Sequence, residues 1–429
     1  MKFFNELGQF MLAGARAHAK WELDVSNTIL GSRKRIIILG LLLIPIIIGG
    51  IAFAGGEIVG GLPDVLGGKK AYSPAFYTPT IFIASILVGL GAGLITGCIG
   101  AGGGFIIAPA LMSAGVKGIL AVGTDLFHIF AKAIMGSVLH KKLGNVNVPL
   151  AAIFLIGAII GATAGGMLNR YLYEINPVLS DAFITTVYVF MLGFLGFYAL
   201  MDYLRSRKAE SAGDAHSDPT VGELIPPLGQ KLQSVKIPPM IKFDEGITPG
   251  GRQISAIFLI ISGAVVGMAA GIMGVGGGFL TFPIFVYGLG VSSMTTVGTD
   301  IFQIIFTAGY AAISQYAVYG FIFYTLAMGM LLGSLFGIQI GSLVTKVVPG
   351  ITIRGFYAMA VIAGFINRVF ALPGKLMEME VINITQKTAY ILEQIGIYGF
   401  FIVIGIFGVW VFGVFFRNIH ILKGEATAS

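Results

Sequence analysis

Charged side chains are scarce in this chain of 429 residues, because Asp, Glu, Lys and Arg together make up only 11% of it. A soluble domain is nearer one quarter charged, which argues against an ordinary water-soluble enzyme. Cys98 is the single cysteine, so an intrachain disulfide is excluded and the residue is expected to be a small apolar filler rather than a reactive thiol. The motifs HExxH, GxSxG and GxxxxGK are absent, and we predict no cofactor, no metal site and no enzyme activity.

Long apolar runs fill most of the sequence, and hydrophobic residues make up 56% of it. Between Gln253 and Thr345 the only charged side chain is Asp300. Because about 20 apolar residues cross a bilayer as a helix, we predict an all-α integral membrane protein with about 9–10 transmembrane spans and two short broken-helix segments. The net charge of +7 lies in the gaps between the runs. That pattern is typical of loops beside a membrane, so we expect a lipid bilayer as the environment and no nucleic acid as a partner.

The runs and the composition breaks between them divide the chain. We expect a cytoplasmic N-terminal segment with either an interfacial helix or a short soluble one, because Phe3, Leu7, Phe10 and Met11 share a helical face. The next run is expected to be an extra transmembrane helix; a signal peptide is disfavoured by the long, partly acidic segment before it. The expected divisions are 1–35 (N-terminal segment), 36–55 (extra helix), 78–203 (first membrane repeat), 204–252 (cytoplasmic linker), 253–371 (second membrane repeat), 372–394 (extracytoplasmic loop), 395–416 (last transmembrane helix) and 417–429 (cytoplasmic tail).

The chain repeats itself. Residues 97–109 read GCIGAGGGFIIAP and residues 271–283 read GIMGVGGGFLTFP, while VGTDLF at 122–127 returns as VGTDIF at 297–302. Glycines spaced by four then follow in both halves, and the separation between copies stays near 174–176 residues throughout. Three features that recur in order at a nearly constant separation indicate an internal duplication. These glycines are Gly157, Gly161 and Gly165 in the first copy and Gly333, Gly337 and Gly341 in the second.

The distribution of Lys and Arg predicts how the two halves are oriented. If 98–116 and 275–291 each carry the chain across the membrane, nineteen Lys and Arg residues fall on the cytoplasmic side and seven outside. The positive-inside rule favours this arrangement over one in which the two segments turn back. Each half then has an odd number of crossings, so the halves are predicted to be inverted relative to each other, which is a recurring plan among transporters.

The duplicated glycine blocks predict a binding site. Runs of glycine interrupt helices, and bare backbone inside a bilayer is tolerated only where it is buried or lines a wet cavity. A helix that starts after the interruption directs a partial positive charge at the gap, which suits an anion. Close helix packing at small residues is the alternative. Pro109 and Pro283 are expected to end or kink the short helices that follow. The candidate substrate-binding glycines are Gly100, Gly102, Gly103, Gly104, Gly274, Gly276, Gly277 and Gly278.

Asp125 and Asp300 are the acidic members of the duplicated VGTD blocks, and they lie inside apolar runs. An intramembrane carboxylate is costly, so we interpret both as lining a central cavity and coupling transport to a proton or cation, with Thr124 and Thr299 beside them. The alternative is an N-cap for helices beginning at 126 and 301. His128 and Lys132 share a helical face with Asp125, and Gln303 and Thr307 are their neutral counterparts. Besides the glycines, the candidate substrate-binding residues are Thr124, Thr299, His128, Lys132 and Gln303. Lys132 either pairs with Asp125 or an anion, or snorkels; His140 is expected at the inner interface.

At these residues the chain resembles the sulfite exporter TauE/SafE family, also called the toluene sulfonate uptake permeases. The resemblance covers about 80–427 without the central linker, and it depends on the paired GxGGGFxxxP and VGTD blocks. The run GTDLFHIFAKAIMGSVLH at 123–140 is similar to a family branch in which Asp, Lys and His recur. The resemblance implies transport of sulfur oxyanions or organosulfonates across the cytoplasmic membrane of a prokaryote.

We therefore expect a secondary transporter of small sulfur-containing anions (sulfite, sulfate, thiosulfate or organosulfonate) that works by alternating access. Export is the expected direction, because an inside-negative potential expels each negative charge with about 2.3 kcal/mol per 100 mV. A proton or sodium ion is the expected co-substrate if transport is coupled. The alternatives are an anion channel and a membrane-embedded enzyme.

Overall fold

The computed structural model describes residues 62–72, 78–99, 104–142, 146–211, 227–245, 250–344 and 347–418. Several predictions from the sequence lie outside these residues. They are the N-terminal segment at 1–35, the extra helix at 36–55, the glycines Gly100, Gly102 and Gly103, and the tail after Asn418.

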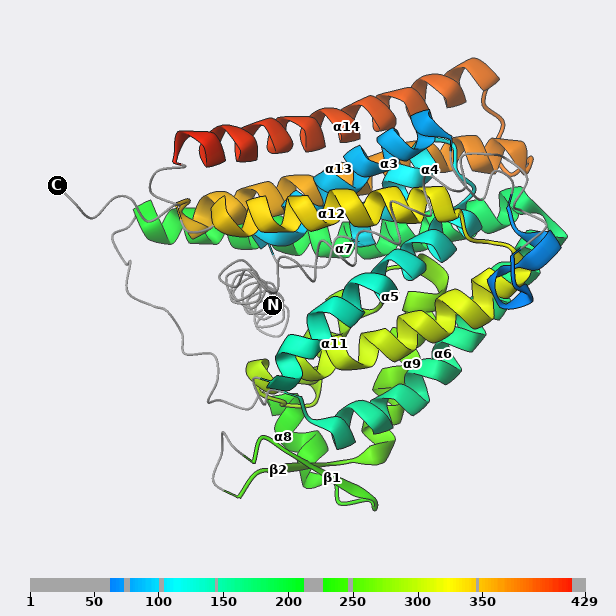
Figure 1. Ribbon diagram of the computed structural model, residues 1–429. Coiled ribbons are helices and arrows are strands. Elements are labelled where there is room, and N and C mark those ends of the chain that lie inside the picture. The colour runs from blue at the N-terminus through cyan, green and yellow to red at the C-terminus, as the bar shows by residue number, and fades with distance from the viewer. Residues whose placement is uncertain are drawn as a thin grey trace.

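Within the described residues the fold is helical, apart from one pair of short strands (Figure 1). Eight of the described helices are long and apolar enough to span a membrane, which confirms the predicted all-α integral membrane class. The helices are α3 (Pro79–Ile99), α4 (Gly104–Ser113), α5 (Gly118–Lys142), α6 (Val148–Ile175), α7 (Pro177–Ser211), α8 (Pro227–Ser234), α9 (Ala256–Met273), α10 (Gly278–Pro283), α11 (Ser293–Tyr310), α12 (Tyr324–Val344), α13 (Gly350–Glu378) and α14 (Gln386–Arg417).

Some helix bounds differ from those expected. Helix α13 continues through Pro373 to Glu378, and α14 already begins at Gln386, so the connection between them is shorter than the predicted loop at 372–394. The side chain of Thr385 explains the early start of α14, because it accepts a hydrogen bond from the amide of Thr388 and so caps the helix. Of the charged residues there, Glu378 and Lys387 lie on the last turn of α13 and the first turn of α14, Glu393 lies further along α14, and only Glu380 lies in the connection.

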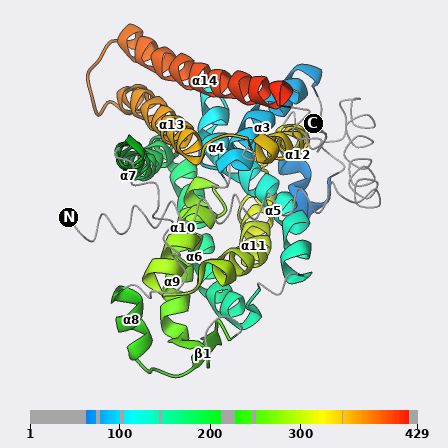
Figure 2. The same ribbon diagram turned by 90° about the vertical axis from the view of Figure 1, so that its left-hand side faces the viewer.

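The outer surface of the bundle is apolar. Phe190 on α7 is 73% exposed and Val409 on α14 is 77% exposed, and α14 is the least buried of the candidate spans. A soluble protein rarely exposes apolar patches of this extent, whereas lipid solvates them. Helix α14 packs mainly on α13 along one side and presents its other side outward at the edge of the bundle (Figures 1 and 2).

Two parallel helix pairs form the closest seams, and both pairs join the halves of the chain. Helix α6 packs on α9, and a Cβ at Gly161 would contact the carbonyl oxygen of Ala264. Helix α3 packs on α12, where a Cβ at Gly337 would contact the carbonyl oxygen of Leu90. Small residues allow this approach of two backbones in a membrane. The two contacts match at offsets of 176 and 174 residues, which supports the predicted repeat.

Helix ends gather at two opposite ends of the bundle. At one end the amide of Tyr72 donates to the carbonyl of Gly320, and Nζ of Lys117 lies 3.2 Å from the hydroxyl of Tyr173. At the other end Nδ2 of Asn147 donates to the carbonyl of Lys242. The connection before α5 thus lies at the first end and the one before α6 at the second. These positions support the arrangement in which 98–116 and 275–291 cross the membrane; the inverted orientation stays a prediction.

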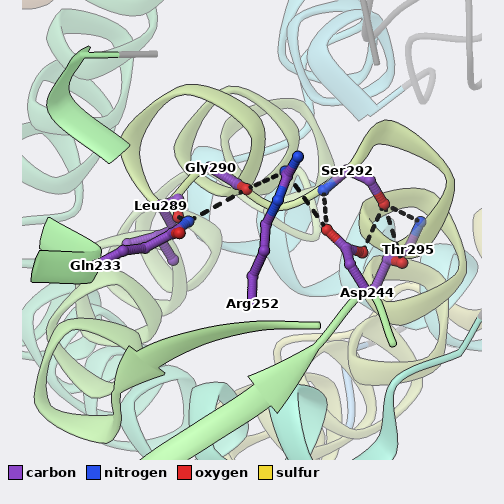
Figure 3. A network of polar contacts seen from close by, with 7 residues as sticks. All are labelled: Gln233, Asp244, Arg252, Leu289, Gly290, Ser292 and Thr295. Carbon is purple, nitrogen blue, oxygen red and sulfur yellow. Dashed lines mark hydrogen bonds and ion pairs between the residues drawn. The ribbon is translucent and has the colours of Figure 1, made fainter. Parts of the chain in front are cut away.

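The linker folds against the second of these ends. Helix α8 and the antiparallel strands β1 (Met240–Phe243) and β2 (Arg252–Ser255) lie together beyond the ends of α6 and α9 (Figures 1 and 2). Figure 3 shows how they hold the connection between α10 and α11. Oδ2 of Asp244 accepts from the amide of Ser292 at 2.9 Å, and Nη1 of Arg252 donates to the carbonyl of Gly290 at 2.9 Å. The sequence predicts this segment only as a linker.

Asp244→Ala is expected to loosen this connection. The carboxylate of Asp244 accepts from the amide and the hydroxyl of Ser292, and it lies 3.7 Å from Nη1 of Arg252. Ser292 is the N-cap of α11. In the variant its amide and hydroxyl lose their acceptor, which should lower the free energy of unfolding by about 1–3 kcal/mol. Hydrogen exchange of the amides at 289–295 should accelerate. The exposed Glu245 supplies the control Glu245→Ala, and equal exchange in both variants would contradict the assignment.

Candidate functional site

The start of α4 meets the second glycine-rich interruption inside the bundle. A Cβ at Gly104, the first residue of α4, would lie 3.1 Å from Cα of Val275 in the connection between α9 and α10. The side chain of Ile129 on α5 packs against both segments. Its atoms would lie 3.1 Å from a Cβ at Gly104 and 2.8 Å from a Cβ at Gly276. Segments 171 residues apart in the chain (275 − 104) are therefore in direct contact at the centre of the fold.

Each of the two short helices begins beside an aspartate. A Cβ at Gly104 would lie 3.3 Å from Oδ2 of Asp125, and a Cβ at Gly278 would lie 3.3 Å from Oδ2 of Asp300. Asp125 is fully buried and Asp300 nearly so. The first amides of any helix have no partner within that helix and carry its partial positive charge. Both carboxyl groups thus lie next to groups that attract anions.

The connection between α9 and α10 has a backbone that only glycine adopts readily. Gly274, Gly276 and Gly277 have φ angles of 80°, 68° and 84°, in the left-handed region that side chains with a Cβ disfavour. These three of the predicted glycines therefore allow the turn itself, and Gly278 begins the helix that follows. The alternative of close packing also applies here, since a Cβ at Gly274 would lie 2.8 Å from Cα of Val122.

Three side chains that the sequence analysis did not single out bind the carbonyl end of α9. Nδ2 of Asn169 donates to the carbonyls of Gly271 and Ile272 at 3.2 and 3.0 Å. The hydroxyl of Tyr316 also donates to Gly271, and that of Tyr188 donates to Met273. A helix that ends inside the bilayer needs such donors, because no water can hydrate its last carbonyls. Because these carbonyls have donors, the groups at this interruption that lack a partner within a helix are the first amides of α10.

Thr124 and Thr299 have structural partners. The hydroxyl of Thr124 accepts from the amide of Phe323 at 2.9 Å, and that of Thr299 accepts from the amide of Asn147 at 3.1 Å. Phe323 and Asn147 immediately precede α12 and α6, so each threonine holds the start of a helix from the other half of the chain. The proposed N-cap alternative for Asp125 and Asp300 is wrong, because α5 and α11 begin two turns earlier.

The predicted polar face on α5 and its neutral counterpart on α11 are both present. Nδ1 of His128 lies 3.6 Å from Oδ1 of Asp125, and Nε2 of His128 lies 3.0 Å from the hydroxyl of Ser334 on α12. The half-buried Lys132 interacts electrostatically with Asp125; its role stays a prediction. On α11, Nε2 of Gln303 donates to Oδ1 of Asp300 at 2.9 Å.

The remaining predicted residues are the two prolines, the cysteine and His140. Helix α4 continues through Pro109 to Ser113, so this proline does not end it, whereas Pro283 is the last residue of α10 and a π-helical turn over Ile284–Gly288 follows. Cys98 is buried against α12, where its thiol contacts the carbonyl of Gly341, as expected of a filler. The side chain of His140 lies outside the described residues.

Arg170 and Arg368 are among the seven Lys and Arg residues expected outside the membrane, and both are buried in the fold. Arg368 on α13 is 2% exposed and donates through Nη2 to the hydroxyl of Ser113 at 2.7 Å. Arg170 on α6 donates through Nη1 to the carbonyl of Gln315 at 2.7 Å and lies over the ring of Tyr319. Ser113 is the last residue of α4, so Arg368 places a cation at the negative end of that helix. Arginine inside an apolar run was the available signal for both.

Comparisons with known proteins agree with this architecture. The sequence pattern of the family described as "Sulfite exporter TauE/SafE" matches residues 85–368. Probable membrane transporter protein YjnA of Bacillus subtilis is 25% identical over 61% of this chain and 89% of its own length.

Sulfite exporter TauE/SafE family protein 6 of Arabidopsis thaliana is 30% identical over 25% of this chain and 27% of its own. No solved structure matches the chain. Because the family pattern spans more than half of its residues, the chain belongs to the sulfite exporter TauE/SafE family of membrane transporters.

Proposed function

We propose that this transporter moves small sulfur-containing anions, namely sulfite, sulfate, thiosulfate or an organosulfonate, across the cytoplasmic membrane of a prokaryote. The observation that carries the proposal is the contact inside the bundle between the start of α4 and the connection that leads into α10. Peptide amides at a helix start bind oxyanions without a dedicated cation. Lys132 adds positive charge on the neighbouring α5.

Alternating access is favoured over a channel by the packing at this point. Ile129 occupies the space against Gly104 and Gly276, and Cδ1 of Ile304 would lie 3.1 Å from a Cβ at Gly278. A solute reaches the helix starts only if these apolar side chains withdraw. Such a rearrangement suits a carrier that opens to one side at a time. Membrane-embedded catalysis has no observation of this kind in its favour.

The direction we propose is export, with transport coupled to a proton or a sodium ion through the buried carboxyl groups of Asp125 and Asp300. The membrane potential alone favours the exit of an anion by about 2.3 kcal/mol per charge per 100 mV. Two charged carboxylates beside the helix starts would repel the substrate, so at least one of them must be neutralised while an anion is bound.

Counterflow in proteoliposomes tests the proposal. Vesicles loaded with unlabelled sulfite, sulfate, thiosulfate or methanesulfonate should transiently accumulate the same labelled anion, whereas a channel would only equilibrate it. Gly104→Leu is expected to reduce uptake at least tenfold, because the added side chain meets Asp125 and Val275 at the start of α4. Gly405→Leu on α14 is the control, since a Cβ there meets nothing within 4 Å. Absence of counterflow for all four anions in folded wild-type protein would refute the proposed substrate class.

A further inference from the structure

The two duplicated aspartates differ in how their polar atoms are satisfied. On α11, Asp300 accepts from Nε2 of Gln303 at 2.9 Å, and Oε1 of Gln303 accepts in turn from the hydroxyl of Thr307 at 2.7 Å. All three side chains are buried. Asp300 is therefore the terminal acceptor of a chain of hydrogen bonds along α11, and Thr281 on α10 supplies it with a further side-chain hydrogen bond.

Asp125 on α5 has no such chain. Both of its carboxyl oxygens and Nδ1 of His128 are buried without a hydrogen-bond partner among the described residues. The two side chains face each other, since Nδ1 of His128 lies 3.6 Å from Oδ1 of Asp125. A buried carboxylate without donors is costly. A single proton held between an acid and an imidazole would remove most of that cost, because it supplies the missing donor.

The groups that face Asp125 and His128 do not compete with this pair for a proton. Lys132 on α5 interacts electrostatically with both members, and Tyr188 on α7 interacts with Asp125 although its hydroxyl donates to Met273. From α12, Ser334 contacts only the far nitrogen of the His128 ring. From α4, the neighbour of the carboxyl is Gly104, which does not titrate.

Asp125 also stands where an anion would bind. Its Oδ2 lies close to the start of α4, a helix of ten residues, so the carboxylate itself occupies the positive end of that helix. A substrate anion approaching the same amides meets a negative charge of the protein. It can bind only when that charge has been removed.

We propose that Asp125 and His128 form the proton-binding site of the transporter, and that a proton bound there admits the substrate anion to the start of α4, while Asp300 keeps its hydrogen bonds and exchanges no proton. This inference depends on the proposed function. It narrows the coupling site from two carboxyl groups to one, makes the coupling ion a proton, and makes transport a symport in which proton and anion move in the same direction. A singly charged anion that moves with one proton carries no net charge, so export then follows the outward gradient of the anion against any inward proton gradient, and not the membrane potential.

Infrared difference spectra of the purified full-length protein test the proton site without any substrate. Acidification of the wild type and of Asp300→Asn should produce the C=O stretch of a buried carboxylic acid, and Asp125→Asn should lose that band. Asn has the size and hydrogen-bonding pattern of a protonated Asp, so the variant is expected to fold; Asp125→Ser serves if size exclusion shows otherwise. A band that persists in both Asp125 variants, or disappears in Asp300→Asn, overturns the assignment.

Flux measurements test the coupling. Methanesulfonate and sulfate keep their charge across the working pH range, and valinomycin with equal potassium sets the membrane potential to zero. A pH difference of one unit, acid outside, should drive the wild type and the control Gly405→Leu, whose added side chain meets nothing within 4 Å of its Cβ, towards about tenfold accumulation if one proton accompanies each anion. Asp125→Asn should equilibrate the anion without accumulating it. Accumulation by Asp125→Asn overturns the inference, whereas absence of sulfur-anion flux in the wild type refutes the proposed function and leaves the infrared result to stand alone.

Discussion

Gly161→Leu is expected to prevent formation of the folded bundle. A Cβ at this position of α6 would contact the carbonyl oxygen of Ala264 and would lie 2.7 Å from the amide nitrogen of Met268. Both atoms belong to the backbone of α9, so no side-chain movement relieves the clash. The helices would have to separate along their whole seam. Overpacking costs about 1–3 kcal/mol where neighbours can adjust, and more where they cannot.

Size exclusion of a fluorescent fusion in detergent measures this effect. The Gly161→Leu protein should elute as aggregate or fail to accumulate in the membrane. Gly399→Leu on α14 is the matched control, because a Cβ there meets nothing within 4 Å and the added side chain enters lipid. If Gly161→Leu eluted and melted as the wild type does, the close contact between α6 and α9 would be incorrect.

Asn169→Leu should strongly destabilise the interruption after α9. The side-chain amide of Asn169 donates to the carbonyls of Gly271 and Ile272 and to the hydroxyl of Tyr316, and it is fully buried. Leucine is similar in volume but donates nothing. We expect a loss of about 2–4 kcal/mol in the free energy of unfolding, since each buried polar group left without a partner costs about 1–3 kcal/mol.

Asn169→Leu should also reduce the rate of transport in the protein that remains folded, because the orientation of Gly276–Gly278 depends on where α9 ends. Thermal melting in detergent and sulfite counterflow give the two readouts. Asn418→Leu is the control, since the amide of Asn418 donates to the carbonyl of Val414 at the end of α14, away from the centre. Equal melting temperatures and equal flux in the two variants would show that the hydrogen bonds of Asn169 do not hold the interruption.

Local pattern predicts a good part of this molecule. Apolar runs predict the membrane helices, because crossing a bilayer requires a fixed length of apolar residues. The glycine blocks predict where α9 stops and α10 begins, because Gly274, Gly276 and Gly277 adopt left-handed angles. Helical periodicity places Asp125 and His128 on one face of α5, and the structure shows them adjacent.

Contacts between distant segments could not be predicted in the same way. Nothing in the sequence around Thr124 indicates that its hydroxyl accepts from the amide of Phe323, which lies 199 residues later. The pairing of Asn169 with the end of α9 has the same origin. Both depend on how complete helices pack, and a single sequence contains the pattern of each helix but not its neighbours. Polar residues isolated in apolar runs, such as Asn169 and Arg170, are the signal that could have marked them.

The seams that join the halves have a consequence for biosynthesis. Helix α3 packs chiefly on α12, yet α3 ends at Ile99 and α12 begins only at Tyr324. A ribosome therefore completes more than two hundred residues between the two partners. During that time the glycine-lined side of α3 lies in the membrane without its final neighbour, and an insertase or another nascent helix must shield it. Fragments separated at the linker should accordingly become active only when both are produced in the same cell.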